Sequence, residues 1–272
     1  MNMLVCVKQV PDTTEIRIDP VKNTLIRDGV PSILNPFDSY ALEAALRVKD
    51  QYPQARLTAL CMGPPQAAAV LKESLAVGAD RAYLVSGRTY GGSDTLATSY
   101  ILSEAIREIE KTEGKFDIIF CGKQAIDGDT AQVGPEIGEH LGYAQVTYGL
   151  EVLLEADMVK VKKEVEEGVE VIGVKTPCVL TFTKPAWDLR RPTLKGKLAA
   201  ARAGITVIGD DGLPDIDKAK IGLKGSPTKV KKTFVPPRKS GGLKIREASN
   251  RESAEKLFQL LMKDRTIWEG DV

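Results

Sequence analysis

Short apolar runs and longer stretches of near-helical spacing take turns along the first half of the chain. The apolar runs predict strands, and the stretches in which apolar residues recur every three or four positions predict helices. Each predicted strand is followed by one predicted helix. The strand–helix pairs are 3–7 with 35–49, 56–62 with 66–77, 81–85 with 95–110, and 116–121 with 135–141. Four strands alternating with four helices predict an α/β fold with a doubly wound, mostly parallel sheet.

The pattern changes in the second half. Apolar and polar residues alternate over 151–175 around a turn at Glu167 and Gly168, which predicts an antiparallel hairpin. A further buried strand is expected at 177–183, and a small hairpin or extended excursion is expected earlier in the chain, at 16–26.

The last third of the chain is basic and less regular. The run 187–202 is rich in Lys and Arg, which is typical of a solvated loop or of a surface that docks an acidic partner. An extended arm rich in Lys, Pro, Gly and Ser is expected over 222–242, followed by an amphipathic helix over 252–263. Its apolar face packs either on its own domain or on a partner subunit. We therefore expect one domain over 1–222 and an arm with its helix over 223–272.

The amino-acid composition and net charge exclude several classes of protein. A chain of 272 residues with 43% hydrophobic and 28% charged residues is ordinary for a soluble globular protein. The net charge of +1 argues against a general nucleic-acid binder. No apolar run approaches the roughly 20 residues of a membrane span. The isolated cysteines, in or beside predicted strands, are typical of reduced thiols. A cytoplasmic protein fits these features.

The loop at 122–134 is the most informative stretch of the chain. It is rich in Gly, Asp and Thr and lies between a buried strand and a helix with Pro135 in its first turn, where Asp129 or Thr130 is able to cap. The helix N-terminus is then a site for an anion such as a phosphate. The loop matches neither the Walker pattern nor the dinucleotide glycine pattern. An ordinary strand-to-helix turn is the alternative.

Several other loops follow strands in the same way. The segments 8–12, 62–64, 91–95 and 122–134 are all expected at the carboxyl edge of the sheet, where ligands of open α/β sheets bind. Their convergence predicts a nucleotide pocket.

Residues for acid–base or nucleophilic chemistry are scarce. His140 lies near the end of a predicted surface helix and reads as an exposed residue without a function. No Cys or Ser has a base at a recognisable spacing. Asp127 and Asp129 are able to hold a metal, but such residues more often cap a helix or accept hydrogen bonds from a ribose or adenine. We expect no catalytic residue and no metal site, so that a bound cofactor supplies any chemistry.

Motifs along the whole chain resemble the β subunit of electron transfer flavoprotein. They are Val5-Cys6-Val7-Lys8, Asn35-Pro36-Phe37, Met62-Gly63-Pro64, Leu75-Ala76-Val77-Gly78-Ala79-Asp80-Arg81, and Gly122-Lys123-Gln124-Ala125-Ile126-Asp127 followed by Asp129 and Gly134. The resemblance implies a Rossmann-like, adenine-nucleotide-binding subunit of a heterodimer. Its C-terminal helix would pack on the α subunit.

The resemblance leaves two nucleotides open. The housekeeping branch of the family holds a structural AMP, whereas the branch of anaerobes and nitrogen fixers holds a second FAD that accepts hydride from NADH and splits the electron pair. This chain is similar to the second branch over 9–13, 35–38, 93–98 and 127–135. We therefore expect FAD and electron bifurcation. The alternative is a non-catalytic subunit that holds AMP, is colourless alone and does not respond to NADH.

The resemblance also implies site residues. Nucleotide contacts are expected from Cys6, Asn35, Pro36, Phe37, Asp38, Met62, Gly122, Lys123, Gln124, Ala125, Ile126, Asp127, Gly128, Asp129, Thr130, Ala131, Gln132, Val133 and Gly134. Backbone N–H groups over 130–134 would hold phosphate, and Asp94, Thr95 and Thr98 would line the flavin end. Leu194, in a recognition loop over 186–202, matches the anchor that docks on a flavin-containing dehydrogenase. Residues 187–192 depart from the family pattern, which leaves an acyl-CoA dehydrogenase and a hydroxy-acid dehydrogenase both open as partners.

Overall fold

The computed structural model describes residues 1–12, 31–155, 158–231 and 241–263 of the chain. The excursion expected at 16–26 therefore lies outside the described residues. The chain divides into two compact units, Met1–Thr233 and Phe234–Val272, and each is described by itself. Residues 223–228, assigned to the arm from the sequence, are grouped with the first unit.

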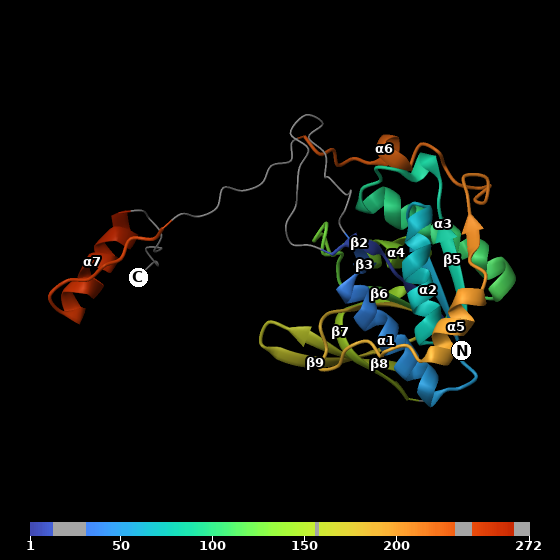
Figure 1. Ribbon diagram of the computed structural model, residues 1–272, viewed down its shortest axis with the longest axis horizontal. Coiled ribbons are helices and arrows are strands. Elements are labelled where there is room, and N and C mark those ends of the chain that lie inside the picture. The colour runs from blue at the N-terminus through green and yellow to red at the C-terminus, as the bar shows by residue number, and fades with distance from the viewer. Residues whose placement is uncertain (13–30, 156–157, 232–240, 264–272) are drawn as a thin grey trace. The chain divides into compact units, whose positions relative to one another are not determined.

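A nine-stranded sheet forms the centre of the first unit (Figure 1). In spatial order the strands are β11 (Thr206–Ile208), β5 (Arg81–Val85), β4 (Arg56–Met62), β1 (Asn2–Cys6), β6 (Ile118–Gly122), β10 (Cys178–Phe182), β7 (Ala144–Glu155), β8 (Met158–Val165) and β9 (Gly168–Val174). All neighbours from β11 to β7 are parallel, and β8 and β9 continue the sheet antiparallel. The predicted doubly wound, mostly parallel sheet is confirmed.

Helices cover both faces of this sheet. They are α1 (Pro36–Gln51), α2 (Ala68–Val77), α3 (Thr95–Glu113), α4 (Val133–Leu141) and α5 (Leu194–Arg202). Met3 and Val5 of β1 pack in one core with α1 and α2, whereas Leu4 between them packs in a second core with α3 and α4. Successive strand residues point to opposite faces, so a continuous apolar strand serves both cores.

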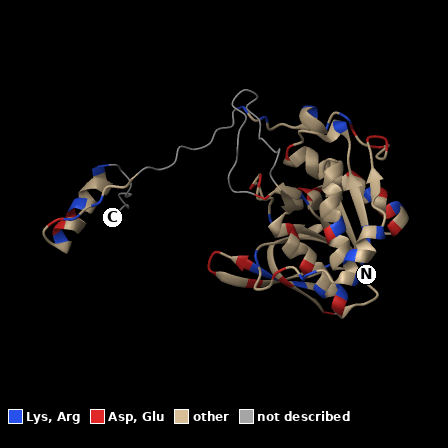
Figure 2. Ribbon diagram, viewed as in Figure 1, with Lys and Arg blue, Asp and Glu red and all other residues tan. Residues whose placement is uncertain are grey.

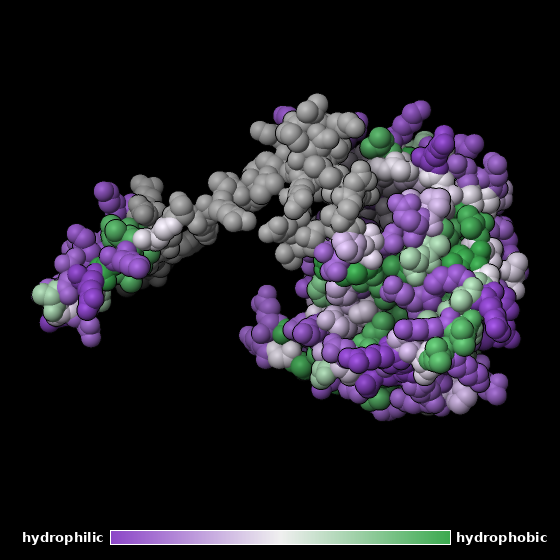
Figure 3. Space-filling view, in the orientation of Figure 1, coloured by the Kyte–Doolittle hydropathy of each residue, from purple (hydrophilic) through white to green (hydrophobic). Residues whose placement is uncertain are grey.

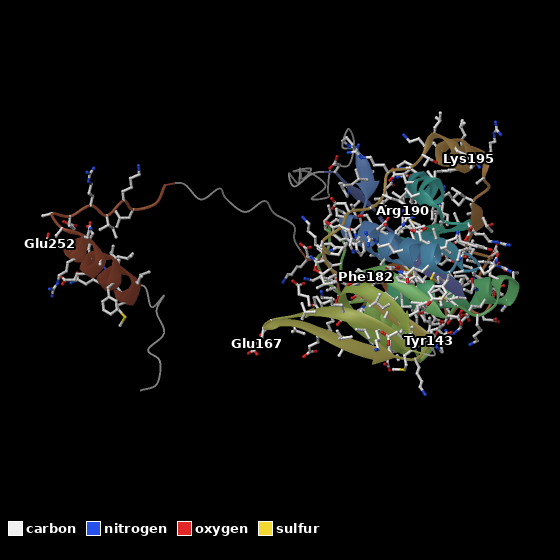
Figure 4. All side chains as sticks on the ribbon, turned by 90° about the horizontal axis from the view of Figure 1, so that it is seen from below. Tyr143, Glu167, Phe182, Arg190, Lys195 and Glu252 are labelled. Atoms are coloured by element: carbon white, nitrogen blue, oxygen red, sulfur yellow. The ribbon has the colours of Figure 1, made fainter. Side chains whose placement is uncertain are left out.

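The expected hairpin belongs to the main sheet. β7 starts parallel to β10 at Ala144 and then pairs antiparallel with β8. Tyr148 lies at φ 59° where the pairing of β7 passes from one neighbour to the other. Glu167 is at the tip of the β8–β9 ribbon, where acidic residues gather (Figures 2 and 4).

The expectation of an irregular run over 187–202 is wrong for its second half. α5 begins after Thr193, whose side chain caps it by accepting a hydrogen bond from Gly196 N at 3.0 Å. The high charge of this stretch concealed a helix whose buried Ala200 packs in the same core as α1 and α2. Arg190 (labelled in Figure 4) is not a free positive charge. Its guanidinium pairs with Glu43 and Asp50 of α1.

Shorter elements complete the described chain. They are β2 (Gln9–Pro11) and β3 (Ser32–Leu34), which pair antiparallel, and η1 (Pro65–Ala67), η2 (Arg88–Tyr90), α6 (Gly222–Gly225) and α7 (Asn250–Lys263). In the second unit, α7 confirms the expected C-terminal helix, and its Leu257 and Phe258 are exposed. The face of the first unit in Figure 3 is largely polar, with apolar residues in small areas between charged ones.

Candidate functional site

A cavity of about 410 Å³ opens at the carboxyl edge of the sheet. β1 and β6 are neighbours there, yet β1 leads to α1 on one face and β6 leads to α4 on the other. Such a topological switch point is where open α/β sheets bind their ligands. The four expected loops converge on this cavity through Lys8, Met62, Asp94 and the segment after β6.

The cavity brings together most of the residues that the sequence predicted. Its lining includes Cys6, Asp38, Met62, Asp94, Thr95, Thr98, Gly122, Lys123, Gln124, Ala125, Gly128, Thr130, Ala131, Gln132, Val133 and Gly134. The predicted contacts outside this lining are Asn35, Pro36, Phe37, Ile126, Asp127 and Asp129.

Asn35 does not line the cavity but holds the loop that does. Its fully buried side chain donates from Nδ2 to the Gln124 carbonyl at 2.8 Å and accepts at Oδ1 from Ile126 N at 3.2 Å. Its amide thereby fixes the loop after β6. Pro36 begins α1, and the Phe37 ring lies edge-on to Tyr40.

Asp38 joins the ends of the two central strands. Its carboxylate accepts a hydrogen bond from Lys8 N at 2.7 Å, and a Cβ on Gly122 would collide with Oδ1. Burial raises the pKa of this carboxyl to about 7, against the opposing effect of its hydrogen bonds. The hydrogen bond to Cys121 and burial likewise raise the pKa of Cys6, which keeps the thiol neutral.

The loop after β6 is held by its own side chains. Lys8 Nζ pairs with Asp127 Oδ1 at 2.7 Å, and Gln124 Nε2 donates to Asp129 Oδ1 at 2.7 Å. Asp129 and Ala131 adopt φ values of 52° and 55°, an uncommon conformation for residues with a Cβ. Strained backbone of this kind is concentrated at ligand sites.

The expected cap of α4 by Asp129 or Thr130 is wrong. The N-cap residue is Gln132, and within the described residues no side chain accepts a hydrogen bond from the first turn. The positive φ values and the Gln124 contact direct the Asp129 carboxylate elsewhere. Val133 and Gly134, the first residues of α4, line the cavity, and among the described residues no side chain accepts a hydrogen bond from their N–H groups.

Other lining residues were not predicted as contacts. Lys8, Gly92 and Ser93 come from loops expected at this edge, whereas Val7, Leu60, Tyr90, Leu102 and Cys121 come from strand ends, η2 and α3. Their apolar character indicated a core position, and only the register of the sheet shows which strand ends reach the cavity.

His140 is not the exposed residue expected. It is half-buried with its ring edge-on to Tyr100 at 5.7 Å, and its Nε2 is buried without a hydrogen-bond partner among the described residues. The cause is the packing of α4 on α3. Over the described ranges, no group of three acidic, His or Cys side chains is placed to hold a metal, and no helix is long and apolar enough to cross a membrane.

Comparisons with known proteins agree with this arrangement. Residues 22–211 match the model of the electron transfer flavoprotein domain. The electron transfer flavoprotein subunit beta of Megasphaera elsdenii is 53% identical over 271 residues, covering 98% of this chain and 100% of the relative. Protein FixA of Azorhizobium caulinodans is 43% identical over 277 residues (100% and 98%), and the caffeyl-CoA reductase-Etf complex subunit CarD of Acetobacterium woodii is 44% identical over 267 residues (98% and 100%).

Proposed function

This chain belongs to the electron transfer flavoprotein family, as a β subunit, and on that premise we propose that its cavity binds FAD. The chain would then be the subunit of an αβ heterodimer at which hydride from NADH enters. From there the electron pair would divide between the α-subunit FAD and a partner flavin dehydrogenase. When bound, FAD supplies this redox chemistry, and the protein supplies binding and orientation.

The uncapped start of α4 fits the pyrophosphate of such a ligand. The N–H groups of Val133 and Gly134 and the positive end of the helix favour negative charge at this point. Gly134 permits the start of α4 to lie close to the ends of β6 and β10, because a Cβ there would lie 2.6 Å from Thr181 Cγ2 and 3.3 Å from Cys121 Cβ. Glycine at this position therefore lets the helix start directly on the ends of β6 and β10.

The other end of the cavity suits a flat ring. Tyr90, Thr98 and Leu102 line it from η2 and α3, and Leu60 and Met62 line it from β4. A mainly apolar wall with a few polar groups is typical of sites for cofactors and other small molecules. The extension of one cavity from the start of α4 to this apolar wall is the observation that favours FAD over AMP, which ends at its phosphate.

The partner surfaces follow from the same family membership. Leu194 is the first residue of α5 and is 76% exposed, as a docking anchor must be. Relatives are named as subunits of caffeyl-CoA reductase and acryloyl-CoA reductase systems, which supports a dehydrogenase of CoA thioesters over a hydroxy-acid dehydrogenase. In the second unit, the exposed Leu257 and Phe258 of α7 offer an apolar face to the α subunit.

Filling the apolar end tests the assignment. Thr98→Phe is expected to reduce the FAD content of the co-expressed αβ pair from two to one per heterodimer, because its ring occupies the place of the flavin ring. NADH should then no longer bleach the flavin absorbance under anaerobic conditions. Both changes are measured by denaturing release of the nucleotides and by titration.

Leu96→Phe is the matched control, because Leu96 lies on the same turn of α3 with its side chain exposed. It should retain both flavins and the NADH response. A Thr98→Phe pair that keeps two FAD and is reduced by NADH would contradict the proposed position of the ring.

A further inference from the structure

Asp38 is the buried charged residue in the lining of the cavity, and the function proposed above gives its charge no role. Its side chain lies at the N-terminal turn of α1, is 7% exposed, and still lines the cavity. An ionised carboxylate with so little access to water is costly unless its partners compensate for lost hydration. Its position therefore has to be explained by what it contacts.

The contacts of Asp38 are the ends of the two strands that bound the switch point. Lys8 N, just after β1, donates to Oδ2 at 2.7 Å, and Gly122, the last residue of β6, is in contact with Oδ1. The compensation comes from the neutral side-chain amide of Asn35 and from the backbone N–H groups of Lys8 and Gly122, and the positive charge of Lys8 adds to it. The ammonium group of Lys8 is committed elsewhere, to Asp127 at 2.7 Å.

The expected anion site lies at the same cavity, because Val133 and Gly134 at the start of α4 line it together with Asp38. Gly134 packs against Cys121 on the face of β6 that α4 covers, and Asp38 approaches the next residue, Gly122, from the face that α1 covers. An anion at the N–H groups of α4 and an ionised Asp38 would repel each other across the end of β6. Because Asp38 is buried, such repulsion is weakly screened.

We propose that Asp38 binds one proton when an anionic nucleotide enters the cavity, so that the complex contains a neutral carboxylic acid at this position. This inference rests on the proposed nucleotide site. The proton comes from the buffer and is returned to it when the nucleotide leaves. No bond to the ligand is formed or broken. A neutral carboxyl keeps an acceptor oxygen for Lys8 N.

Among the titratable groups around the cavity, Asp38 is the one that we expect to take up the proton near neutral pH. From β1 and β4 it faces the thiols of Cys6 and Cys61, whose pKa values are raised, that of Cys61 to about 12 by burial. Cys121 of β6, Lys123 just after it and Lys8 after β1 line the same cavity, and the positive charge of Lys8 opposes the rise in the pKa of Asp38. Burial brings the pKa of Asp38 to about 7, so that a small added repulsion changes its protonation at neutral pH.

Protonation of Asp38 and binding of the nucleotide are thermodynamically linked, and this linkage sets the direction in which the affinity changes with pH. Bound anion raises the pKa of Asp38 further, so the affinity is constant below about pH 7 and falls as the pH rises above it. The limit for one linked proton is about tenfold per pH unit well above the pKa, and we expect roughly three- to fivefold weaker FAD binding from about pH 7 to about pH 8.

The test uses the full chain in its αβ pair. The nucleotide is first removed from this cavity, and the pair is then titrated with FAD in a calorimeter. FAD is the appropriate probe because its pyrophosphate does not titrate near neutral pH. At neutral pH, the heat measured in two buffers of different ionisation enthalpy should show uptake of a fraction of one proton, increasing toward one as the pH rises. Asp38→Asn should bind FAD without this uptake and with an affinity independent of pH. Asp50→Asn, at the other end of α1, should behave as the wild type.

Equal heats in both buffers with pH-independent FAD affinity would overturn the role of Asp38 and leave the nucleotide site intact. Proton uptake that persists in Asp38→Asn would also overturn it. Failure of the wild-type pair to bind FAD at any pH would overturn the proposed function itself. If Asp38→Asn does not fold, the buffer dependence of the wild-type heat still decides whether a proton is bound.

Discussion

Two helices begin at the rim of the cavity, and their first turns are completed in different ways. α3 has its own anion, because Asp94 Oδ1 accepts from Ala97 N at 3.0 Å. α4 has Gln132 at the corresponding position and no side-chain cap within the part of the chain that the structure describes. Both ends belong to long loops after parallel strands, yet the first turn of α3 already holds a carboxylate, whereas the first turn of α4 holds none.

The difference extends to what surrounds each helix start. The second oxygen of Asp94 accepts from Thr228 N at 2.9 Å, and Ser226 Oγ accepts from Asp94 N at 2.9 Å. These contacts secure the segment after α6 to the first unit. The start of α4 is surrounded instead by Gly134, Gly128 and residues of positive φ. One helix start therefore serves the fold, and the other remains available for phosphate.

Closing the start of α4 should have the largest effect. Gly134→Ala introduces a Cβ that would lie 2.6 Å from Thr181 Cγ2, which displaces the N–H groups from the ligand. We expect at least about tenfold weaker nucleotide retention, corresponding to about 1.4 kcal/mol or more. The measurement is the nucleotide content of the αβ pair after dialysis.

Gly138→Ala in the same helix is the control for this change. A Cβ there would have ordinary contacts, the nearest at 3.5 Å, and the helix should be unaffected or slightly stabilised. Equal nucleotide loss in both variants would indicate that helix packing, and not the free N–H groups, sets the affinity.

Removing the cap of α3 should act on stability and spare the phosphate end. Asp94→Ala deletes the acceptor for Ala97 N and Thr228 N, and loss of such a cap costs about 1–2 kcal/mol of unfolding free energy. Chemical denaturation measures this loss. If the variant instead kept full stability but lost its nucleotide completely, the division of roles between the two helix starts would be wrong.

Ser226→Ala should give the smallest effect of the series. The buried hydroxyl accepts from Asp94 N and donates to the Gly222 carbonyl at 2.8 Å, so its loss costs about 1 kcal/mol of unfolding free energy. Nucleotide content should not change, because the start of α4 is untouched. A stability loss larger than that of Asp94→Ala would show that the hydroxyl, and not the carboxylate, holds the segment after α6.

The sequence predicted the fold well because β1, β4, β5 and β6 are continuous apolar runs and a helical pattern follows each of them along the chain, whereas the short β11 has no such signal and was not predicted. Its errors lie where charge obscures packing. α5 was not predicted because Lys and Arg dominate its exposed face, and the basic run before it was interpreted as a solvated loop or docking surface although Arg190 pairs with Glu43 of α1.

The site was predictable as a set of loops but not in its chemistry. The loop after β6 contains two acids beside a helix, which favours a capping role. Positive φ values turn the carboxylate of Asp129 toward Gln124, and no local pattern reveals this. The apolar wall at Leu60, Tyr90 and Leu102 depends on sheet register between strands distant in sequence. These residues are indistinguishable from core residues until the strands are aligned.

The nucleotide content of the co-expressed αβ pair tests the central claim most directly. The bound nucleotides are released by denaturation, and FAD and AMP are counted per heterodimer. Two FAD and no AMP is the expected result, with one flavin in the cavity between the start of α4 and the apolar wall. One FAD with one AMP would contradict the account, because the chain would then hold a structural nucleotide and hydride from NADH could not enter through it.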